Sequence, residues 1–295
     1  MKMKKRNVIQ QIILALIFIV LCALIVLPFV MLVSVSFSNE QDVIKNGYSI
    51  WPRQLDTSAY KYIFKNPGAI INAYKVTAIF SVLGTFLSVL FMAMLAYPLS
   101  KRNLRGKKGI SLYIYFTMLF SGGLVPTYIL ITRYLHLNDT IWVYVLPGMI
   151  SPWFVFMMRT FFQDIPNEIF ESMLIDGADE FNIFFRTVLP LSKPVLATVA
   201  LLTFLGKWND WYTSMLYINN QSLVSLQYLL QRIMQNIALL QNDVAGSNSM
   251  ISITDIPSET VRMAMAVVVA GPALIIFPFF QKYFVKGLTV GSVKG

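Results

Sequence analysis

The side chains best suited to polar chemistry in this sequence are six carboxylates between two long apolar stretches. They lie within residues 163–191, at Asp164, Glu168, Glu171, Asp176, Asp179 and Glu180. Asp164 is placed to cap a helix whose first turn contains Pro166 and Glu168. The helix dipole stabilises acidic side chains at this end of a helix. Gly177 then interrupts the helical pattern. This half of the segment is expected to offer a charged surface to another protein.

The second half of the same segment is apolar. Phe181, Phe184 and Phe185 recur at helical spacing and predict a short helix with an aromatic stripe, which Pro190 ends. Residues 163–191, called the acidic loop below, are therefore expected to form a helix, a bend and a helix. The alternative is an ordinary amphipathic connector between two membrane spans.

A second polar group lies inside an apolar stretch, residues 192–218. It consists of aromatic, amide and carboxylate side chains at Trp208, Asn209, Asp210, Trp211 and Tyr212. Such groups at membrane depth usually face a bundle interior or a water-filled cavity, and this set could bind the hydroxyls and apolar faces of a sugar. The alternative is that Asn209 and Asp210 tie helices together while the rings form a belt at the outer interface.

Other reaction chemistries lack their residues in this sequence. There is no Gly-x-x-x-x-Gly-Lys-Ser/Thr motif, so the chain is not expected to be an ATPase itself. His136 is the one histidine and Cys22 the one cysteine, which leaves neither a metal cluster nor an internal disulfide. We expect no catalytic residue, no metal and no other cofactor in this chain, and we expect that it is not an enzyme.

The elements that hold these residues are expected to be membrane helices. Of the 295 residues, 56% are hydrophobic and 13% charged, and the mean hydropathy is +0.63, which is outside the usual balance of a soluble domain. The net charge of +10 comes from Lys and Arg near the ends of apolar runs, where basic residues orient spans toward the cytoplasm. Membrane lipid, and no nucleic acid, is the expected partner of this surface.

The fold class is thus predicted as an all-α integral membrane protein with six transmembrane helices and cytoplasmic N- and C-termini. The core transmembrane domain is about 70–285. The expected segments are a cytoplasmic N-terminus 1–11, spans 12–37, 73–100, 110–131, 139–162, 192–218 and 262–281, external loops 38–72 and 219–261, a basic cytoplasmic loop 101–109, the cytoplasmic acidic loop 163–191 and a cytoplasmic tail 282–295.

The order of residues in the acidic loop resembles a known family. Glu171-Ser172-Met173, Asp176-Gly177-Ala178 and Leu189-Pro190 are similar to the cytoplasmic "EAA" loop in permease subunits of ATP-binding-cassette (ABC) importers. The resemblance is greatest to carbohydrate-uptake permeases of the maltose inner-permease and LplC/YtcP-like oligosaccharide types, and it extends to the Trp208-Asn209 pair and the tail 283–295. Ser172 and Met173 depart from the two alanines of the family pattern.

This resemblance implies a function and a set of partners. It implies the type I ABC importer permease fold and a permease that moves a sugar or oligosaccharide from an extracytoplasmic sugar-binding protein across the cytoplasmic membrane. The implied partners are a second permease subunit in a heterodimer and two ATPase subunits, which bind ATP and Mg. The implied coupling residues are Glu171, Ser172, Asp176, Gly177, Ala178, Leu189 and Pro190.

The external loop 219–261 is expected to begin with an amphipathic helix. Leu226, Leu230, Ile233 and Ile237 follow helical spacing, and the other face is too polar to cross a membrane. A flexible stretch, residues 241–249, follows. By the same resemblance it is the candidate contact for the binding protein, through Asn242, Asp243, Gly246, Ser247 and Asn248. A plain solvated linker is the alternative.

A self-contained secondary transporter of a small polar solute is the main rival function. It would be expected to show inverted repeats and several intramembrane ionisable residues as coupling sites. The apolar stretches contain one acid, Asp210, and no clear repeat. The sequence therefore favours a permease that depends on a separate ATPase.

Overall fold

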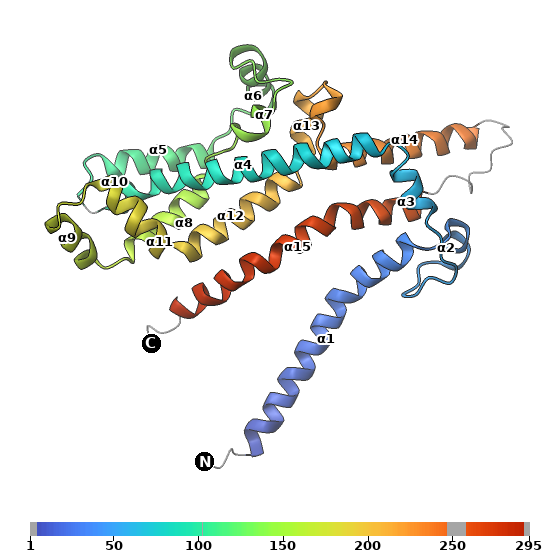
Figure 1. Cartoon of the computed structure of the whole chain (residues 1–295), viewed down its shortest axis with the longest axis horizontal. Helices are drawn as coiled ribbons and strands as arrows, with labels where there is room; N and C mark the ends of the chain where they lie inside the picture. The colour runs from blue at the N-terminus through green and yellow to red at the C-terminus, as the bar shows by residue number, and fades with distance from the viewer. Residues whose placement is uncertain (1–4, 102, 247–257, 292–295) are drawn as a thin grey trace. The chain divides into compact units, whose positions relative to one another are not determined.

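The computed structural model describes residues 5–101, 103–246 and 258–291, and within them the regular structure is helical except for one isolated bridge between Ser38 and Leu55 (Figure 1). The long helices are α1 (Lys5–Ser36), α4 (Pro67–Ser100), α12 (Lys193–Trp208), α14 (Leu226–Gly246) and α15 (Glu259–Gly291). The shorter ones are α2 (Glu40–Asn46), α3 (Ser58–Ile63), α5 (Lys107–Leu119), α6 (Leu124–Ile129), η1 (Leu130–Tyr134), α7 (Trp142–Val145), α8 (Pro152–Gln163), α9 (Asn167–Ile175), α10 (Glu180–Ile183), η2 (Phe184–Val188), α11 (Leu189–Leu191), α13 (Tyr212–Tyr217) and η3 (Gln221–Leu223).

Three helices of the described residues are long and apolar enough to cross a membrane: Gln10–Ser36, Pro67–Ser100 and Glu259–Ile276. Two bent pairs raise the number of candidate spans to five, namely Lys107–Leu119 with Leu124–Tyr134 at 109° and Glu180–Leu191 with Lys193–Trp208 at 79°. In the stretch 139–162, helix α7 ends at Val145 and α8 begins at Pro152. The described chain is therefore an all-helical membrane protein with three to five candidate spans.

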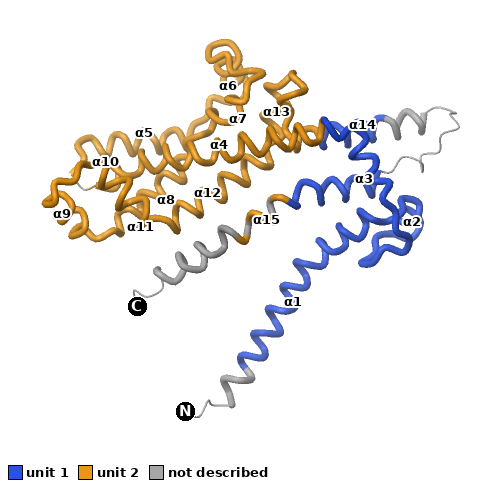
Figure 2. Tube along the Cα trace, viewed as in Figure 1, with its two compact units in different colours: residues 1–68, 230–271 blue, residues 69–229, 272–295 orange. Residues whose placement is uncertain are grey.

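The chain divides into two compact units (Figure 2). Unit 2, residues 69–229 and 272–295, is organised along α4. One buried cluster joins Met92 and Ala96 of α4 to Met158 of α8 and Val199 of α12. A second cluster surrounds Phe80, whose ring stacks on Tyr144 of α7 at 4.2 Å between centroids. Because α4 contributes to both clusters, it is the frame on which the acidic loop and residues 208–212 are mounted.

Unit 1 consists of residues 1–68 and 230–271. In α1 the apolar side chains of the first span are exposed around the helix, Phe18 at 62% and Leu24 at 66%, as expected for a helix whose surroundings are lipid or another membrane chain. At its end, Phe37 stacks on Tyr60 of α3 at 4.7 Å, and Ser36 hydrogen-bonds the Tyr60 hydroxyl at 2.9 Å. These contacts fix the segment 38–64, which was predicted to be external, to the end of α1.

Candidate functional site

The acidic loop bends at Gly177. Its φ of +76° lies in the left-handed region, which glycine adopts without the steric cost that a Cβ brings. The Ala178 N–H donates to Met173 O at 2.9 Å and the Gly177 N–H donates to Leu174 O at 3.1 Å, the two bonds of a Schellman helix end. The turn therefore closes the end of α9, which is at Ile175, and redirects the chain into α10.

The start of the loop differs from the prediction. Asp164 does not cap α9: it follows the last residue of α8, and its own N–H bonds to carbonyl oxygens of that helix. The N-cap of α9 is Pro166, which has no side-chain cap. The prediction was wrong because α8 continues to Gln163, so the Asp164 carboxylate lies at a helix C-terminus. Asp179 caps instead, accepting the Asn182 N–H at 2.9 Å in α10.

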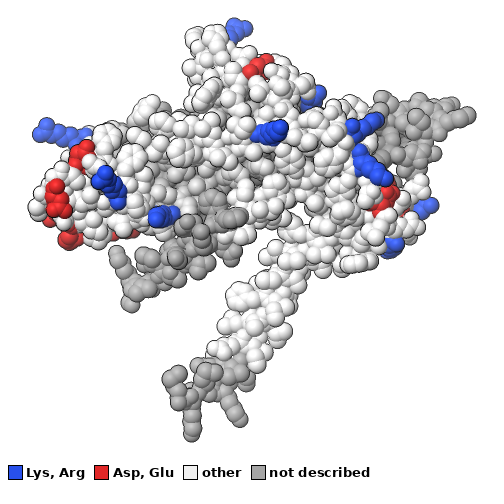
Figure 3. All heavy atoms as spheres, viewed as in Figure 1, with Lys and Arg blue, Asp and Glu red and all other residues white. Residues whose placement is uncertain are grey.

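Helix α9 presents the exposed half of the acidic loop. Glu171, Ser172 and Asp176 are exposed, and next to them Leu174 is 54% and Ile175 is 86% exposed. Figure 3 shows Asp and Glu side chains gathered at the end of unit 2 that carries α9 and α10. Exposed apolar side chains with an acidic rim are typical of a surface that contacts another protein.

The other half of the loop is anchored in unit 2. Ile183, Phe184 and Val188 are buried against α4 and α8, while Ala178 and Leu189 are half-buried. The predicted aromatic stripe therefore does not lie on one buried face, because Phe184 is buried whereas Phe181 and Phe185 are exposed. The predicted end at Pro190 is one residue early. Pro190 lies in α11, which continues the helical run from α10 and η2 and ends at Leu191.

A polar contact that the sequence reasoning missed ties α10 to the end of α4. The Tyr97 hydroxyl donates to Glu180 Oε2 at 2.7 Å, and the Lys101 ammonium pairs with the same carboxylate. Lys101 belongs to the basic stretch 101–109, which its composition identified only as an orientation signal. The partners are 79 to 83 residues apart in sequence, so no local pattern could have joined them.

Residues 208–212 do not share one environment. Trp208 is 4% exposed and packs against Phe204 and Tyr74, with ring centroids at 5.7 and 6.4 Å. Asn209 donates to Leu205 O at 2.9 Å and accepts from Gln227 of α14 at 2.8 Å. These contacts are those of the helix-tying alternative.

The remaining three residues of this group follow the end of α12. The helix ends at Trp208, and Asp210 precedes the N-cap of α13 and accepts the Thr213 N–H of its first turn at 2.9 Å. Trp211 and Tyr212 are 38% and 44% exposed and contact each other edge to face. Asp210 also lines a cavity of about 300 Å³ together with Lys207. Of the five candidates, Asp210 is the one that the structure places at a cavity.

The amphipathic helix predicted for residues 219–261 is present as α14. Leu226, Leu230 and Ile237 of its apolar face are buried, as the spacing predicted. The helix continues to Gly246, so Asn242, Asp243 and Gly246 lie in its last turns rather than in a flexible stretch. Ser247 and Asn248 lie outside the described residues.

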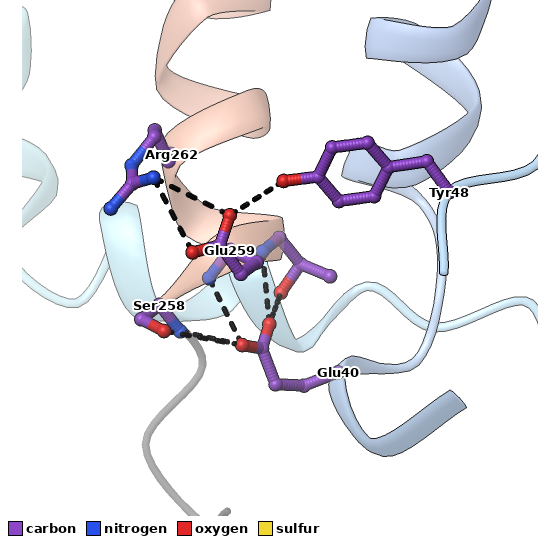
Figure 4. Close-up of polar contacts among 6 residues, drawn as sticks. Glu40, Tyr48, Ser258, Glu259 and Arg262 are labelled. Carbon is purple, nitrogen blue, oxygen red and sulfur yellow. Dashed lines mark hydrogen bonds and ion pairs between the residues drawn. The ribbon is translucent and has the colours of Figure 1, made fainter. Parts of the chain in front are cut away.

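In unit 1, the buried carboxylate of Glu40 binds the beginning of α15 (Figure 4). One oxygen accepts the N–H groups of Ser258 and Glu259 at 3.0 and 2.9 Å, and the other accepts the Thr260 N–H and hydroxyl at 2.9 and 2.6 Å. A negative charge is stabilised at a helix N-terminus because the unpaired N–H groups point at it. Nearby, the Tyr48 hydroxyl donates to Glu259 at 2.7 Å, and this hydrogen bond raises the pKa of Tyr48 above its ordinary value of 10.0.

Comparison with known proteins places this architecture in a family. The family model described as "binding-protein-dependent transport system inner membrane component" matches residues 3–290. The protein LplC of Bacillus subtilis (strain 168) is 37% identical over 273 residues, which cover 92% of this chain and 90% of LplC. The polygalacturonan/rhamnogalacturonan transport system permease protein YtcP of the same organism is 37% identical over 281 residues, covering 94% and 96%.

A solved structure has the same fold. A chain in the crystal structure of a bacterial ABC transporter involved in the import of the acidic polysaccharide alginate superimposes with a TM-score of 0.78 and 26% sequence identity, covering 96% of this chain and 99% of that one. The fold is therefore that of an ABC importer permease. The chain belongs to the family of binding-protein-dependent transport system inner membrane components, as the acidic loop predicted. It is a permease subunit of a binding-protein-dependent ABC importer in the cytoplasmic membrane, and the secondary-transporter alternative is not favoured.

Proposed function

We propose that this permease carries an oligosaccharide released from a larger polysaccharide. Support comes from the names of its relatives, which include the polygalacturonan/rhamnogalacturonan permease YtcP and, at 28% identity over 274 residues, an arabinooligosaccharide permease of Halalkalibacterium halodurans. The solved structure most relevant here belongs to an alginate importer. All three names concern sugar polymers or their fragments.

The proposed assembly contains this chain and a second permease subunit as a heterodimer, two ATPase subunits and an extracytoplasmic sugar-binding protein. ATP and Mg are bound by the ATPase subunits. The proposed topology has six spans with both termini in the cytoplasm, at the bounds predicted from the sequence. The bent helix pair within residues 107–134 supplies the third span and α12 the core of the fifth, while residues 180–191 belong to the cytoplasmic acidic loop. The short helices α7 and α8 together supply the fourth span.

The exposed face of α9 is the proposed contact with the ATPase, and its exposure is the observation that carries this function. Glu171 and Asp176 supply charge, Ser172 supplies a hydroxyl, and the left-handed turn at Gly177 fixes the direction of the helix. Ala178, Leu189 and Pro190 belong to the half of the loop that is packed onto unit 2. Movement of a bound ATPase would thus be passed through α10 and η2 to α4 and α8.

The proposed sugar pathway is limited to the polar end of the group at residues 208–212. Asp210 faces the cavity, and Trp211 and Tyr212 offer partly exposed rings. Trp208 and Asn209 support the pathway by holding α12 to its neighbours. The last turns of α14, with Asn242, Asp243 and Gly246, and the following Ser247 and Asn248 are the proposed contact with the binding protein.

Replacing Gly177 by leucine tests the coupling role. A leucine in the left-handed conformation costs on the order of 1 kcal/mol and would redirect the end of α9. No atom lies within 4 Å of a Cβ placed at Gly177, so the change strains the turn without a clash. ATP-driven uptake in proteoliposomes that contain the whole complex should fall about tenfold or more, the range of a lost coupling between sites. Membrane insertion should be unchanged.

Gly106 provides a matched control. It has φ +77°, open space around its Cβ position and a place in the basic loop before α5. Gly106→Leu has the same conformational cost as Gly177→Leu but lies outside the acidic loop. ATP-driven uptake by the complex that contains Gly106→Leu should therefore remain within about twofold of the original value. Equal uptake in the two variants would contradict the coupling role of Gly177.

A further inference from the structure

Unit 2 contains a cavity that no part of the coupling role explains. It has a volume of about 300 Å³ and lies among α4, the α7–α8 connection and the end of α12. This volume is at the lower end of the roughly 300–1,000 Å³ of small-molecule sites. Its polar lining residues are Tyr144, Ser151, Thr203, Lys207, Asp210 and Thr213.

Lys207 is the cation of this cavity. It lies 14 residues after the start of α12 at Lys193, about 21 Å along a helix that rises 1.5 Å per residue, and thus within the thickness of a bilayer core. Gly84 of α4 makes room for its stem, because a Cβ at Gly84 would lie 2.8 Å from both Cδ and Cε of Lys207. Because Gly84 has no side chain, the stem of Lys207 can lie against α4 while the residue lines the cavity.

The charge of Lys207 is incompletely compensated. Its ammonium donates to the carbonyl oxygens of Tyr144 at 2.9 Å and Val145 at 3.5 Å, which engages two of its three N–H groups. No described carboxylate lies within 4 Å of it, although Asp210 lines the same cavity. A charged side chain at membrane depth is costly unless it meets an opposite charge or a water-filled path. An anionic group entering the cavity would complete the set of partners.

The other lining groups suit the rest of a sugar. The Asp210 carboxylate uses one oxygen for the Thr213 N–H and can accept sugar hydroxyls with the other. Ser151, Thr203 and Thr213 contribute hydroxyl side chains to the lining. Asp210 acts on Lys207 across the cavity but is not in ion-pair contact with it, and a neutral sugar would bring no anionic group within contact distance of the ammonium. The combination favours a sugar that carries a carboxylate as well as hydroxyls.

We propose that this cavity is a binding subsite for an acidic oligosaccharide, in which Lys207 binds the carboxylate of a uronic acid unit and Asp210 binds a hydroxyl. This proposal rests on the proposed function as an oligosaccharide permease and narrows its substrate class. Lys207 acts as a specificity-determining residue.

The test compares acidic sugars with their neutral methyl esters. The complete importer, purified through this chain and reconstituted with its binding protein, is assayed for ATP-driven uptake of oligogalacturonides and oligomannuronates, their methyl esters, and arabino- and galacto-oligosaccharides. The measured quantity is the ratio of acid uptake to ester uptake in the original protein and in Lys207→Gln. Because both contain the same binding protein, a change in the ratio arises in the membrane.

The expected result is a roughly 10- to 100-fold fall of that ratio in Lys207→Gln, the size of a lost charged hydrogen bond. Lys207→Arg should retain most of the ratio, and Gly84→Ala, which displaces the lysine stem, should lower it. Lys75→Gln removes the same charge from an exposed position on α4 and should leave the ratio unchanged.

Two outcomes would overturn the proposal while leaving the oligosaccharide importer intact. One is uptake of neutral sugars or esters but of no uronate by the original protein. The other is an equal loss of acid and ester uptake in Lys207→Gln, which would mark a structural lysine. Uptake of none of these sugars would instead overturn the proposed function.

Discussion

Two charged side chains of this protein, the buried Glu40 in unit 1 and the half-buried Lys207 in unit 2, have their charges compensated in different ways. The Glu40 carboxylate accepts five hydrogen bonds from Ser258, Glu259 and Thr260, with both oxygens engaged. Lys207 donates to two backbone carbonyls and faces a cavity. Glu40 thus has little capacity left for a ligand, whereas Lys207 has an unused donor and space beside it.

The comparison separates a structural charge from a ligand-binding one. A buried charge whose hydrogen bonds are all made within the chain stabilises one arrangement of its elements. A buried charge with an unmade bond at a cavity leaves a cost that a ligand can remove. The predictions below measure stability at both residues and therefore test whether this distinction holds.

The largest loss of stability is expected for Glu40→Ala. It leaves several buried N–H and O–H groups at the start of α15 without an acceptor, at a cost of about 1–3 kcal/mol for each such group and so about 3 kcal/mol or more in total. Thermal unfolding of the protein in mild detergent measures the loss. Gln41→Ala, at the exposed neighbouring position of α2, is the control and should change stability by no more than about 0.5 kcal/mol. Equal melting temperatures for the two variants would contradict a structural role for Glu40.

A smaller loss is expected for Lys207→Met. The methionine fills much of the space of the lysine stem but leaves the carbonyls of Tyr144 and Val145 without their donor, which costs about 1–3 kcal/mol. Unfolding in the same detergent, with Lys75→Met as the exposed control, measures this difference. If Lys207→Met proved as destabilising as Glu40→Ala, the lysine would be a structural charge and the comparison would fail.

The smallest effect is expected for Tyr48→Phe, which removes the hydrogen bond to Glu259 next to the Glu40 site. The pKa of Tyr48 is raised in the folded protein, so its contribution is fully present below the ordinary value of 10.0 and is lost as the pH rises through the folded-state pKa. Tyr48 is 49% exposed, so the loss should be at most about 1 kcal/mol.

Melting temperatures of the original protein and Tyr48→Phe should therefore differ by a constant amount between pH 7 and pH 9 and converge above pH 10. Tyr62→Phe, which removes a tyrosine hydroxyl with no described hydrogen bond to Glu259, is the control. A difference for Tyr48→Phe that disappears below pH 9 would show that its hydroxyl does not donate to Glu259.

The acidic loop shows which parts of the site could be predicted. The left-handed turn at Gly177 and the order of helix, bend and helix followed from residue types, because glycine and helical spacing act over a few residues. The Asp164 cap was mispredicted, since it depended on where the neighbouring helix ended. The Lys101–Glu180 pair had no local signal, because it depends on the packing of α10 against α4.

Residues 207–212 also combine features that the sequence predicted with features that it did not. The sequence identified a polar group inside an apolar stretch and left open whether it bound sugar or tied helices. The structure divides the group, with Trp208 and Asn209 in helix contacts and Asp210 at the cavity. Lys207 was not among the predicted pathway residues, because a single lysine in an apolar stretch belongs to no recognised motif. Its meaning depends on Gly84, which is 123 residues earlier in the chain.

The sequence by itself determined that this chain is a helical membrane protein, because hydropathy and basic loop ends are carried by neighbouring residues, and the resemblance of its acidic loop to a known family identified an ABC importer permease. Only the tertiary structure decided which half of that loop is exposed, which helix start Glu40 caps and where Lys207 points. Those outcomes depend on which distant helices pack together, and burial and hydrogen bonding of a charge are set by that packing rather than by its sequence neighbours.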